Sequence, residues 1–177
     1  MFFLYLFERA LASANARAKS NSDGEGGRGW LVERVSYWMN ALGIAESLEM
    51  VQQGRSRFFE VMVKTAGQKA NIMDVGFGVS QILPFVVLAH FVPRGTVIIT
   101  EQPEIHLHPL VQSGLADLMS EVSQRRNVQF LVETHSEHLF RRMQSLVAEK
   151  KQSPTGCRMY FVEPCQRFRS FFQDSTV

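Results

Sequence analysis

The amino-acid sequence predicts an α/β fold: a largely parallel sheet flanked by helices, preceded by a small helical and β-hairpin flap. Two observations predict this class. From residue 80 onward, apolar helical patterns alternate with short strands that are apolar on both faces, as in parallel sheets covered by helices. Before that point, apolar and polar residues alternate over 59–64 and a glycine-containing turn follows, which indicates antiparallel hairpin strands.

The composition indicates one packed globular domain. Of 177 residues, 45% are hydrophobic and 14 are Phe, which suffices for one sizeable core. The formal net charge of +2 does not indicate a nucleic-acid binder, and we interpret the paired basic residues as solvated helix ends. These pairs are Arg125/Arg126, Arg141/Arg142 and Lys150/Lys151.

The cysteines and the N-terminus favour a cytoplasmic protein with no membrane partner. Cys157 and Cys165 are too few for a disulfide framework and lack Cys-x-x-Cys spacing, which suits a reducing compartment. The apolar opening MFFLYLF lacks a basic leader and meets Glu8 and Arg9 directly. We therefore interpret it as neither a signal peptide nor a membrane span.

Residues 1–74 are predicted to form the flap. Residues 1–19 have a helical pattern, and the polar, glycine-rich stretch at 20–29 predicts a linker. A second helix follows, with Gly43 where a C-terminal cap belongs. Its apolar face carries Leu31, Val35, Trp38, Met39 and Leu42. The hairpin then consists of a strand at 59–64, the turn AGQK and a strand in NIMDV.

Residues 75–163 are predicted to form the main lobe, and 164–177 an aromatic and basic tail. The lobe begins with an apolar helix, ILPFVVLAHFV, in which we interpret His90 as structural. Strands are predicted in TVIIT, VQFLVE and CRMYFVE. The helices between them have apolar faces at Val111, Leu115, Leu118 and Val122, and at Leu139, Met143 and Leu146.

Polar residues follow two of these strands, in TEQPEIHLHP and ETHSEH. Ligands bind beyond the carboxyl ends of parallel strands, so we expect these segments to meet at one edge of the sheet. The residues concerned are Glu101, Gln102, Glu104, Glu133, Thr134 and His135. A buried strand that ends in an acid is the arrangement of a Walker B motif, in which a carboxylate holds Mg²⁺ beside nucleotide phosphates.

Three motifs in order carry a family resemblance: GFGVSQ at 76–81, EQPEIHLHP at 101–109 and ETHSEHL at 133–139. Through them the chain resembles the C-terminal half of ABC-type ATPases of the SMC, RecF and OLD-like branch, in particular AAA-family ATPases, over about residues 30–163. The resemblance implies an ABC/P-loop ATPase-like fold, incomplete in this chain. It also implies ATP and Mg²⁺ as cofactors, and ABC-type dimerisation.

The resemblance implies a role for each matched position. Glu101 corresponds to the Walker B acid and metal ligand, and His135 to the switch histidine that contacts the γ-phosphate or positions water. Gly76, Gly78, Ser80 and Gln81 correspond to the nucleotide-binding signature loop, and Leu107, His108 and Pro109 to the dimer-contacting loop. Glycines allow backbone to approach a phosphate, Ser80 is expected to cap the following helix, and Pro84 to lie near its first turn.

Two departures from the family pattern concern catalysis. Gln102 stands where a glutamate usually acts as general base, and an amide cannot accept a proton at neutral pH. Gln102 could orient water, as glutamine does in some GTPases. Either Glu104 or Glu133 then serves as the base, or hydrolysis is slow. The signature also differs from Leu-Ser-Gly-Gly-Gln, so its exact phosphate donor stays open.

No Gly-x4-Gly-Lys-Ser/Thr phosphate loop occurs in the sequence. We therefore expect a fragment, a truncated paralogue or one half of a split ATPase. Such a chain would be inactive alone and would complete its site with a P-loop-bearing lobe or subunit. Relatives in DNA repair and phage defence make DNA or an effector nuclease further candidate partners.

Two alternative functions stay open. A metal-dependent hydrolase would use four histidines in the two strand-end motifs, because this spacing suits zinc. They are His106, His108, His135 and His138. A non-catalytic regulatory module would use the signature loop or the aromatic tail, and both Gln102 and the missing phosphate loop favour it.

Overall fold

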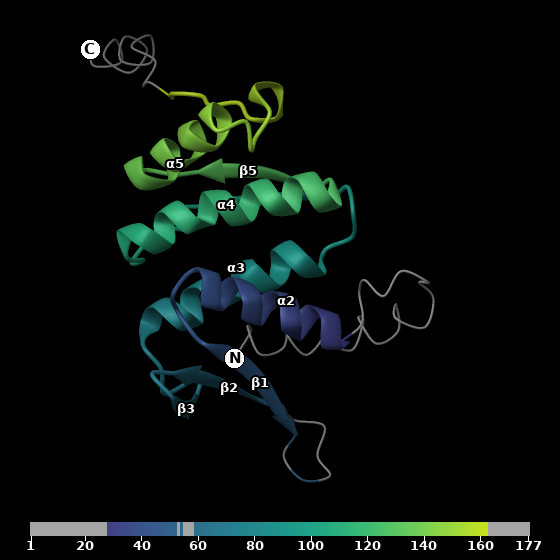
Figure 1. Ribbon diagram of the computed structural model, residues 1–177, viewed down its shortest axis with the longest axis vertical. Coiled ribbons are helices and arrows are strands. Elements are labelled where there is room, and N and C mark those ends of the chain that lie inside the picture. Colours follow the sequence, from purple (N-terminus) through teal and green to yellow (C-terminus); the bar gives the residue numbers. More distant parts are fainter. Residues whose placement is uncertain (1–27, 53, 55–58, 163–177) are drawn as a thin grey trace, which may run out of the picture.

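The computed structural model describes residues 28–52, 54 and 59–162. The helix predicted at 1–19, most of the linker and the tail at 164–177 lie outside the described residues. The elements, shown in Figure 1, are α2 (Arg28–Ala41), β1 (Ser47–Gln52), β2 (Phe59–Thr65), β3 (Gln68–Asn71), α3 (Phe77–Phe91), β4 (Val97–Glu101), α4 (Pro109–Arg126), β5 (Gln129–Glu133), α5 (Glu137–Ala148) and the short 3-10 helix η1 (Pro154–Gly156).

The flap at one end of the molecule is an antiparallel sheet in the order β1-β2-β3. The predicted hairpin is confirmed, but its second strand is 68–71 rather than 71–75. The reason lies in the turn, which uses only Ala66 and Gly67, with φ angles of 49° and 75°. Two positive φ angles match the twist of a tight hairpin, so Gln68 and Lys69 are free to pair. The alternation did not predict β1.

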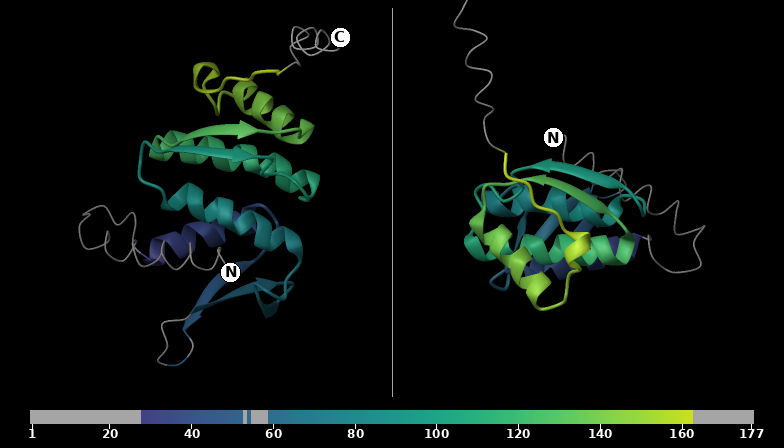
Figure 2. Two further views of the ribbon diagram at one scale, coloured as in Figure 1. Left: turned by 180° about the vertical axis from the view of Figure 1, so that it is seen from behind. Right: turned by 90° about the horizontal axis from the view of Figure 1, so that it is seen from above.

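The main lobe contains the parallel pair β4–β5, with α4 covering one face of it (Figure 2). The mixed α/β class with a parallel sheet flanked by helices is therefore confirmed. The predicted third strand in CRMYFVE is wrong, because residues 157–162 form no strand. Tyr160, Phe161 and Val162 are 76%, 84% and 94% exposed. The ring of Phe161 contacts the ring of Phe140 in α5 edge-on, with 6.1 Å between the ring centroids.

One hydrophobic core runs through both parts of the chain. The predicted apolar face of α2 is confirmed, since all five of its residues are buried, and the predicted faces of α4 and α5 also point inward. Gly43 has a φ of 69° and ends α2 as predicted, with its N–H bonded to the Asn40 carbonyl at 2.8 Å and the Ile44 N–H to the Met39 carbonyl at 2.9 Å. Among the described helices, none has both the length and the apolar character that crossing a bilayer requires.

Helix α3 differs from the prediction at its start. Gly76 is the N-cap and makes no side-chain capping bond, so Ser80 lies inside the helix instead of capping it. Pro84 also lies inside α3 rather than near its first turn, and its ring nitrogen cannot donate to the carbonyl of Ser80. His90 is only 3% exposed, with Nδ1 2.9 Å from the Val86 carbonyl oxygen, which confirms its structural role.

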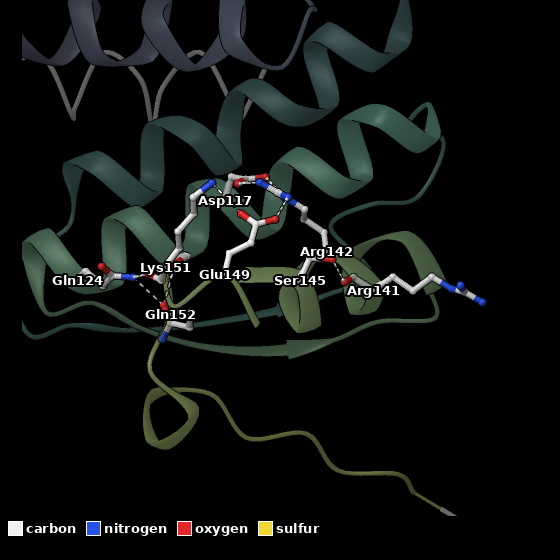
Figure 3. Close-up of polar contacts among 9 residues, drawn as sticks. Asp117, Gln124, Arg141, Arg142, Ser145, Glu149, Lys151 and Gln152 are labelled. Carbon is white, nitrogen blue, oxygen red and sulfur yellow. Dashed lines mark hydrogen bonds and ion pairs between the residues drawn. The ribbon is translucent and has the colours of Figure 1, made fainter. Parts of the chain in front are cut away.

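Side-chain contacts fix α5 and the segment after it against α4 (Figure 3). Arg142 donates to both carboxylate oxygens of Asp117, at 2.7 and 2.9 Å. Beyond α5, Gln124 donates to the carbonyl of Lys151 at 2.7 Å.

Arg126 donates to the carbonyls of Ala89 at 3.0 Å and Val92 at 2.8 Å, at the end of α3. Interpreting the basic pairs as solvated ends is therefore wrong for Arg126 and Arg142.

Candidate functional site

The two strand ends meet at one edge of the sheet, as predicted. In the parallel register Glu101 lies directly opposite Glu133, and both residues are exposed. The Gln102 N–H donates to the Glu133 carbonyl at 2.8 Å, which continues the pairing one residue beyond β4. Carboxylate oxygens are ligands that Mg²⁺ accepts, usually with water and phosphate oxygens in the remaining positions. The Glu101 side chain, exposed at this edge, fits such a role.

Glu104 joins the loops that follow β4 and β5. It is 5% exposed, and its Oε1 accepts a hydrogen bond from the Thr134 hydroxyl at 2.6 Å and from the His135 N–H at 3.0 Å. Its Oε2 is buried and has no hydrogen-bond partner among the described residues. A general base must reach the proton that it takes from water. A carboxylate so enclosed is better suited to holding the two loops together.

The loop after Glu101 is tightly folded. Gln102 and His106 have φ angles of 45° and 61°, in the left-handed region that residues with side chains seldom adopt. Two successive turns support this shape, with the Ile105 N–H bonded to the Gln102 carbonyl at 3.2 Å and the Leu107 N–H to the Glu104 carbonyl at 3.1 Å. Each left-handed residue costs on the order of 1 kcal/mol, and such strain is concentrated at functional sites.

His135 lies exposed between two anchored residues. Ser136 is the N-cap of α5, and its hydroxyl oxygen accepts from the Leu139 N–H at 3.1 Å. The Ser136 N–H donates to the hydroxyl oxygen of Thr134 at 3.0 Å. The backbone is therefore fixed on both sides of a histidine whose side chain faces solvent.

Gln112 of α4 is part of the site although the sequence motifs did not identify it. Its Nε2 donates to the Leu107 carbonyl at 2.8 Å, and its Oε1 accepts from the Ser136 hydroxyl at 2.6 Å. Helical side chains lean toward the N-terminus of their helix. The sequence signal for this role was a glutamine in the first turn of the helix that follows His-Leu-His-Pro, because its long side chain can reach back to the preceding loop.

A hollow of about 240 Å³ lies between the proposed signature loop and the loop after β4. Gly76 and Gly78 line it, whereas Ser80 and Gln81 do not, and the Oε1 of Gln81 is buried without a partner among the described residues. A Cβ at Gly78 would meet only Leu107 Cδ2, at 3.9 Å. The remaining lining residues are Ile44, Val79, His106, Leu107, His108 and Val111.

The residues expected to contact a dimer partner divide into two groups. Leu107 is 7% exposed and packs into the core, whereas His108 and Pro109 are exposed. Nδ1 of His108 accepts from the Leu110 N–H at 3.3 Å and caps α4, which requires that this nitrogen carry no proton. Two apolar side chains are exposed here: Ile105 in the loop, 45% exposed, and Leu110 at the start of α4, 76% exposed.

The four motif histidines give the metal-hydrolase alternative no support. Across residues 28–52, 54 and 59–162, no three His, Cys, Asp or Glu side chains are grouped so that they could hold a metal ion. Zinc sites in proteins use at least three such ligands. The histidines of the two motifs therefore lie at the same edge without converging on a common point.

Solved structures with a similar fold include SMC ATPases and Smc head domains. One, from work on ATP-driven dimerization and DNA-stimulated activation of SMC ATPases, has a TM-score of 0.56 and 19% identity over 73% of this chain and 77% of its own length. The Smc head from Pyrococcus furiosus, with an extended coiled coil and bound to the C-terminal domain of ScpA, has a TM-score of 0.52 and 16% identity over 63% of this chain. The Smc head with a coiled coil and joint from Pyrococcus yayanosii has a TM-score of 0.52 and 18% identity over the same share.

These likenesses show that the chain has the fold of the SMC ATPases. The chain spans only 29% and 23% of the two Pyrococcus heads with their coiled coils. Residues 14–140 match the AAA ATPase domain model, and the chain belongs to that family. Among curated proteins, none matches the sequence.

Proposed function

We propose that this chain supplies the signature loop, the Walker B acid and the switch histidine of a composite ATP site. The observation that carries the proposal is the parallel register, which sets Glu101 opposite Glu133 and brings the loop of His135 to the same edge. The hollow lined by Gly76 and Gly78 beside the loop after β4 supports it further. A lobe bearing a phosphate loop would complete the site, from the same polypeptide or from another.

In this proposal each residue has a distinct task. Glu101 holds Mg²⁺ directly or through water, and the bound ion would neutralise phosphate charge. Gln102 orients the attacking water but cannot take its proton. Glu133, exposed and opposite Glu101 in the register, is then a better candidate base than the buried Glu104. His135 donates a hydrogen bond to the γ-phosphate.

The open face of the β4–β5 pair supports a covering lobe. Parallel sheets are normally covered on both faces. Here α4 covers one face, while Val97, Ile99 and Leu131 are 52%, 70% and 60% exposed. We propose that the P-loop-bearing lobe, which would also bring the backbone amides and lysine for the phosphates, packs on these side chains.

We also propose ATP-dependent association of two such sites. The hollow and the exposed loop around it would face the nucleotide held by the opposing lobe. One similar SMC ATPase is described as dimerising in an ATP-driven manner and as activated by DNA. By analogy, DNA or an effector nuclease would respond to this association, in a cytoplasmic DNA-repair or phage-defence system.

The test compares two glutamates in an assembled site. The chain is mixed with a P-loop-bearing lobe of the same family, and Mg²⁺-ATP affinity is measured. Glu101→Gln should weaken binding by about 2 kcal/mol or more, because a charge-assisted contact to the metal is lost. The control is Glu46→Gln, since Glu46 is an exposed flap residue that pairs with Lys64 at 3.2 Å. Equal affinities of the two variants would contradict the Walker B assignment.

A second candidate, a nucleotide-responsive regulatory module without turnover, is favoured by one observation. The residue beside the proposed metal ligand is Gln102, an amide rather than a carboxylate. With such a module, the assembled site would bind ATP, but the complex would hydrolyse ATP no faster than the P-loop lobe alone. Turnover measured with and without the chain separates the two functions.

A further inference from the structure

We infer that Gln112 is a positioning residue that connects the loop after β4 to the switch histidine. Its consequence for ATP turnover rests on the function proposed above, whereas the connection itself is a property of this chain. The side chain bridges two segments that are distant in sequence, the carbonyl of Leu107 on one side and the hydroxyl of Ser136 on the other.

The orientation of the Gln112 amide follows from its neighbours. A carbonyl only accepts hydrogen bonds, so the nitrogen of Gln112 must face Leu107. The Ser136 oxygen already accepts from the Leu139 N–H, so its own proton is available for the Gln112 oxygen. Both ends of the amide are therefore used, and no other side chain of similar length both donates and accepts in this geometry.

These bonds close a ring that includes Glu104. From Ser136 the ring continues through its N–H to Thr134 at 3.0 Å and from the Thr134 hydroxyl to Glu104 at 2.6 Å. It returns from the Glu104 carbonyl to the Leu107 N–H at 3.1 Å. His135 lies within this ring, with its own N–H bonded to Glu104 and its side chain exposed.

The ring gives the exposed loop a route to His135. The loop lines the hollow beside Gly78, and Ile105 of the loop and Leu110 at the start of α4 face solvent, so an opposing lobe would press on this surface. Any shift of the Leu107 carbonyl changes the Gln112 bond, and through Ser136 it changes the start of α5, next to His135. Without Gln112, Glu104 still links the two loops through its bonds to Thr134 and His135.

The test uses two variants of Gln112 and a matched glutamine at the other end of α4. Gln112→Met removes both bonds at similar volume, and Gln112→Glu keeps the acceptor for Ser136 but loses the donor for Leu107. Gln124→Met is the control, because Gln124 contacts Lys151 and Ser120 rather than the site. In the full chain, amide hydrogen exchange is measured at His135, Ser136 and Leu139.

We expect exchange at these three amides to be about tenfold faster in Gln112→Met, since a partly buried hydrogen bond is worth about that factor. In Gln112→Glu the acceleration should be smaller, and in Gln124→Met absent. In the complex with a P-loop-bearing lobe, Gln112→Met should lower kcat several-fold and leave the KM for ATP unchanged. If Gln112 had only a structural role, Gln112→Met would alter the unfolding midpoint without lowering kcat at an unchanged KM.

The outcomes separate the inference from the proposed function. Unchanged exchange at His135, Ser136 and Leu139 in Gln112→Met would overturn the connection, whether or not the chain binds ATP. Faster exchange together with wild-type kcat would overturn the role in turnover. If the wild-type chain fails to assemble with any P-loop-bearing lobe in Mg²⁺-ATP, the proposed function is refuted. Hydrogen exchange in the chain alone would still decide whether Gln112 connects the two loops.

Discussion

The two ends of the α4–α5 pair are held by similar contacts but differ in where left-handed backbone occurs: at helix C-termini at one end, and inside a loop at the other. At the far end, Gln124 donates to Lys151 and the Ser120 hydroxyl to Gln152 at 2.7 Å. The positive φ angles there, 53° at Asn127 and 59° at Lys150, lie just beyond the C-termini of α4 and α5, where helices commonly end with a left-handed residue. At the site end, Gln112 makes equivalent bonds beside Gln102 and His106, both with positive φ angles. The buried Oε2 of Glu104 adds an unsatisfied acceptor there, among the described residues.

This difference indicates which end is the anchor and which is the site. Unfavourable backbone and unpaired buried oxygens persist only where neighbouring contacts hold them in place. The bidentate pair of Arg142 with Asp117 holds the two helices in register, so the strained loops at the other end have a fixed base. Changes at the site end should therefore alter chemistry, and changes at the far end should alter stability.

The largest expected effect is at the site end. Gln102→Glu restores a carboxylate beside the attacking water, and turnover in the assembled complex should rise about a hundredfold where proton removal limits the rate. The unfolding midpoint of the chain should change little, because the backbone N–H of Gln102, not its side chain, bonds to Glu133. Steady-state ATP hydrolysis and thermal unfolding measure the two effects. Unchanged turnover would indicate that Glu133 or product release governs the rate.

Acid should destabilise the far end through His90. Desolvation lowers the pKa of His90 from 6.5 to about 4, and the charges of Arg34 and Arg126 act in the same direction, against the bond to Val86. Below pH 6.5 the unfolded chain takes up a proton that the folded chain refuses until about pH 4, so stability is present above pH 6.5 and is lost as the pH falls. At pH 5 the loss should be about 2 kcal/mol.

Denaturant unfolding at pH 7 and pH 5 measures this loss. His90→Gln should remove most of the difference between the two pH values, whereas His138→Gln, in an exposed position of α5, should not. The same pH dependence in wild type and His90→Gln would show that other groups cause the acid sensitivity.

The smallest effect concerns the pair that joins the helices. Arg142→Met removes the hydrogen bonds to Asp117 in a place where both side chains are about one-third exposed, so unfolding should become easier by about 1 kcal/mol. Arg141→Met is the matched control, because Arg141 is exposed and, among the described residues, its side chain pairs with Glu137 on its own helix. Mg²⁺-ATP affinity of the folded complex should be the same in both variants. A weaker affinity in Arg142→Met would contradict the division between anchor and site.

Much of the fold was predictable because its signals are local. The apolar face of α2, the αL cap at Gly43 and the meeting of Glu101 with Glu133 follow from periodicity and from the rule for parallel strands. CRMYFVE shows the limit of such patterns. Its apolar residues suit a strand, but a strand also needs a neighbour to pair with, and residues 157–162 have no such pairing.

The candidate site was predictable at the level of segments rather than of single side chains. The motifs identified Glu104 as a possible base, but only the meeting of two loops shows it buried and bonded to Thr134 and His135. Gln112 was missed because its role depends on the same meeting of loops: it joins the Leu107 carbonyl before α4 to the Ser136 hydroxyl before α5. The expected cap at Ser80 failed because α3 begins at Phe77.

The uncovered side of the β4–β5 pair also has a consequence for handling the protein. Val97, Ile99 and Leu131 are exposed apolar side chains on this pair, and within the described residues β4 and β5 pair only with each other. Unprotected strand edges next to apolar side chains act as templates for self-association. Produced alone, the chain should aggregate in a concentration-dependent way, and co-expression with the proposed P-loop-bearing lobe should raise the soluble yield.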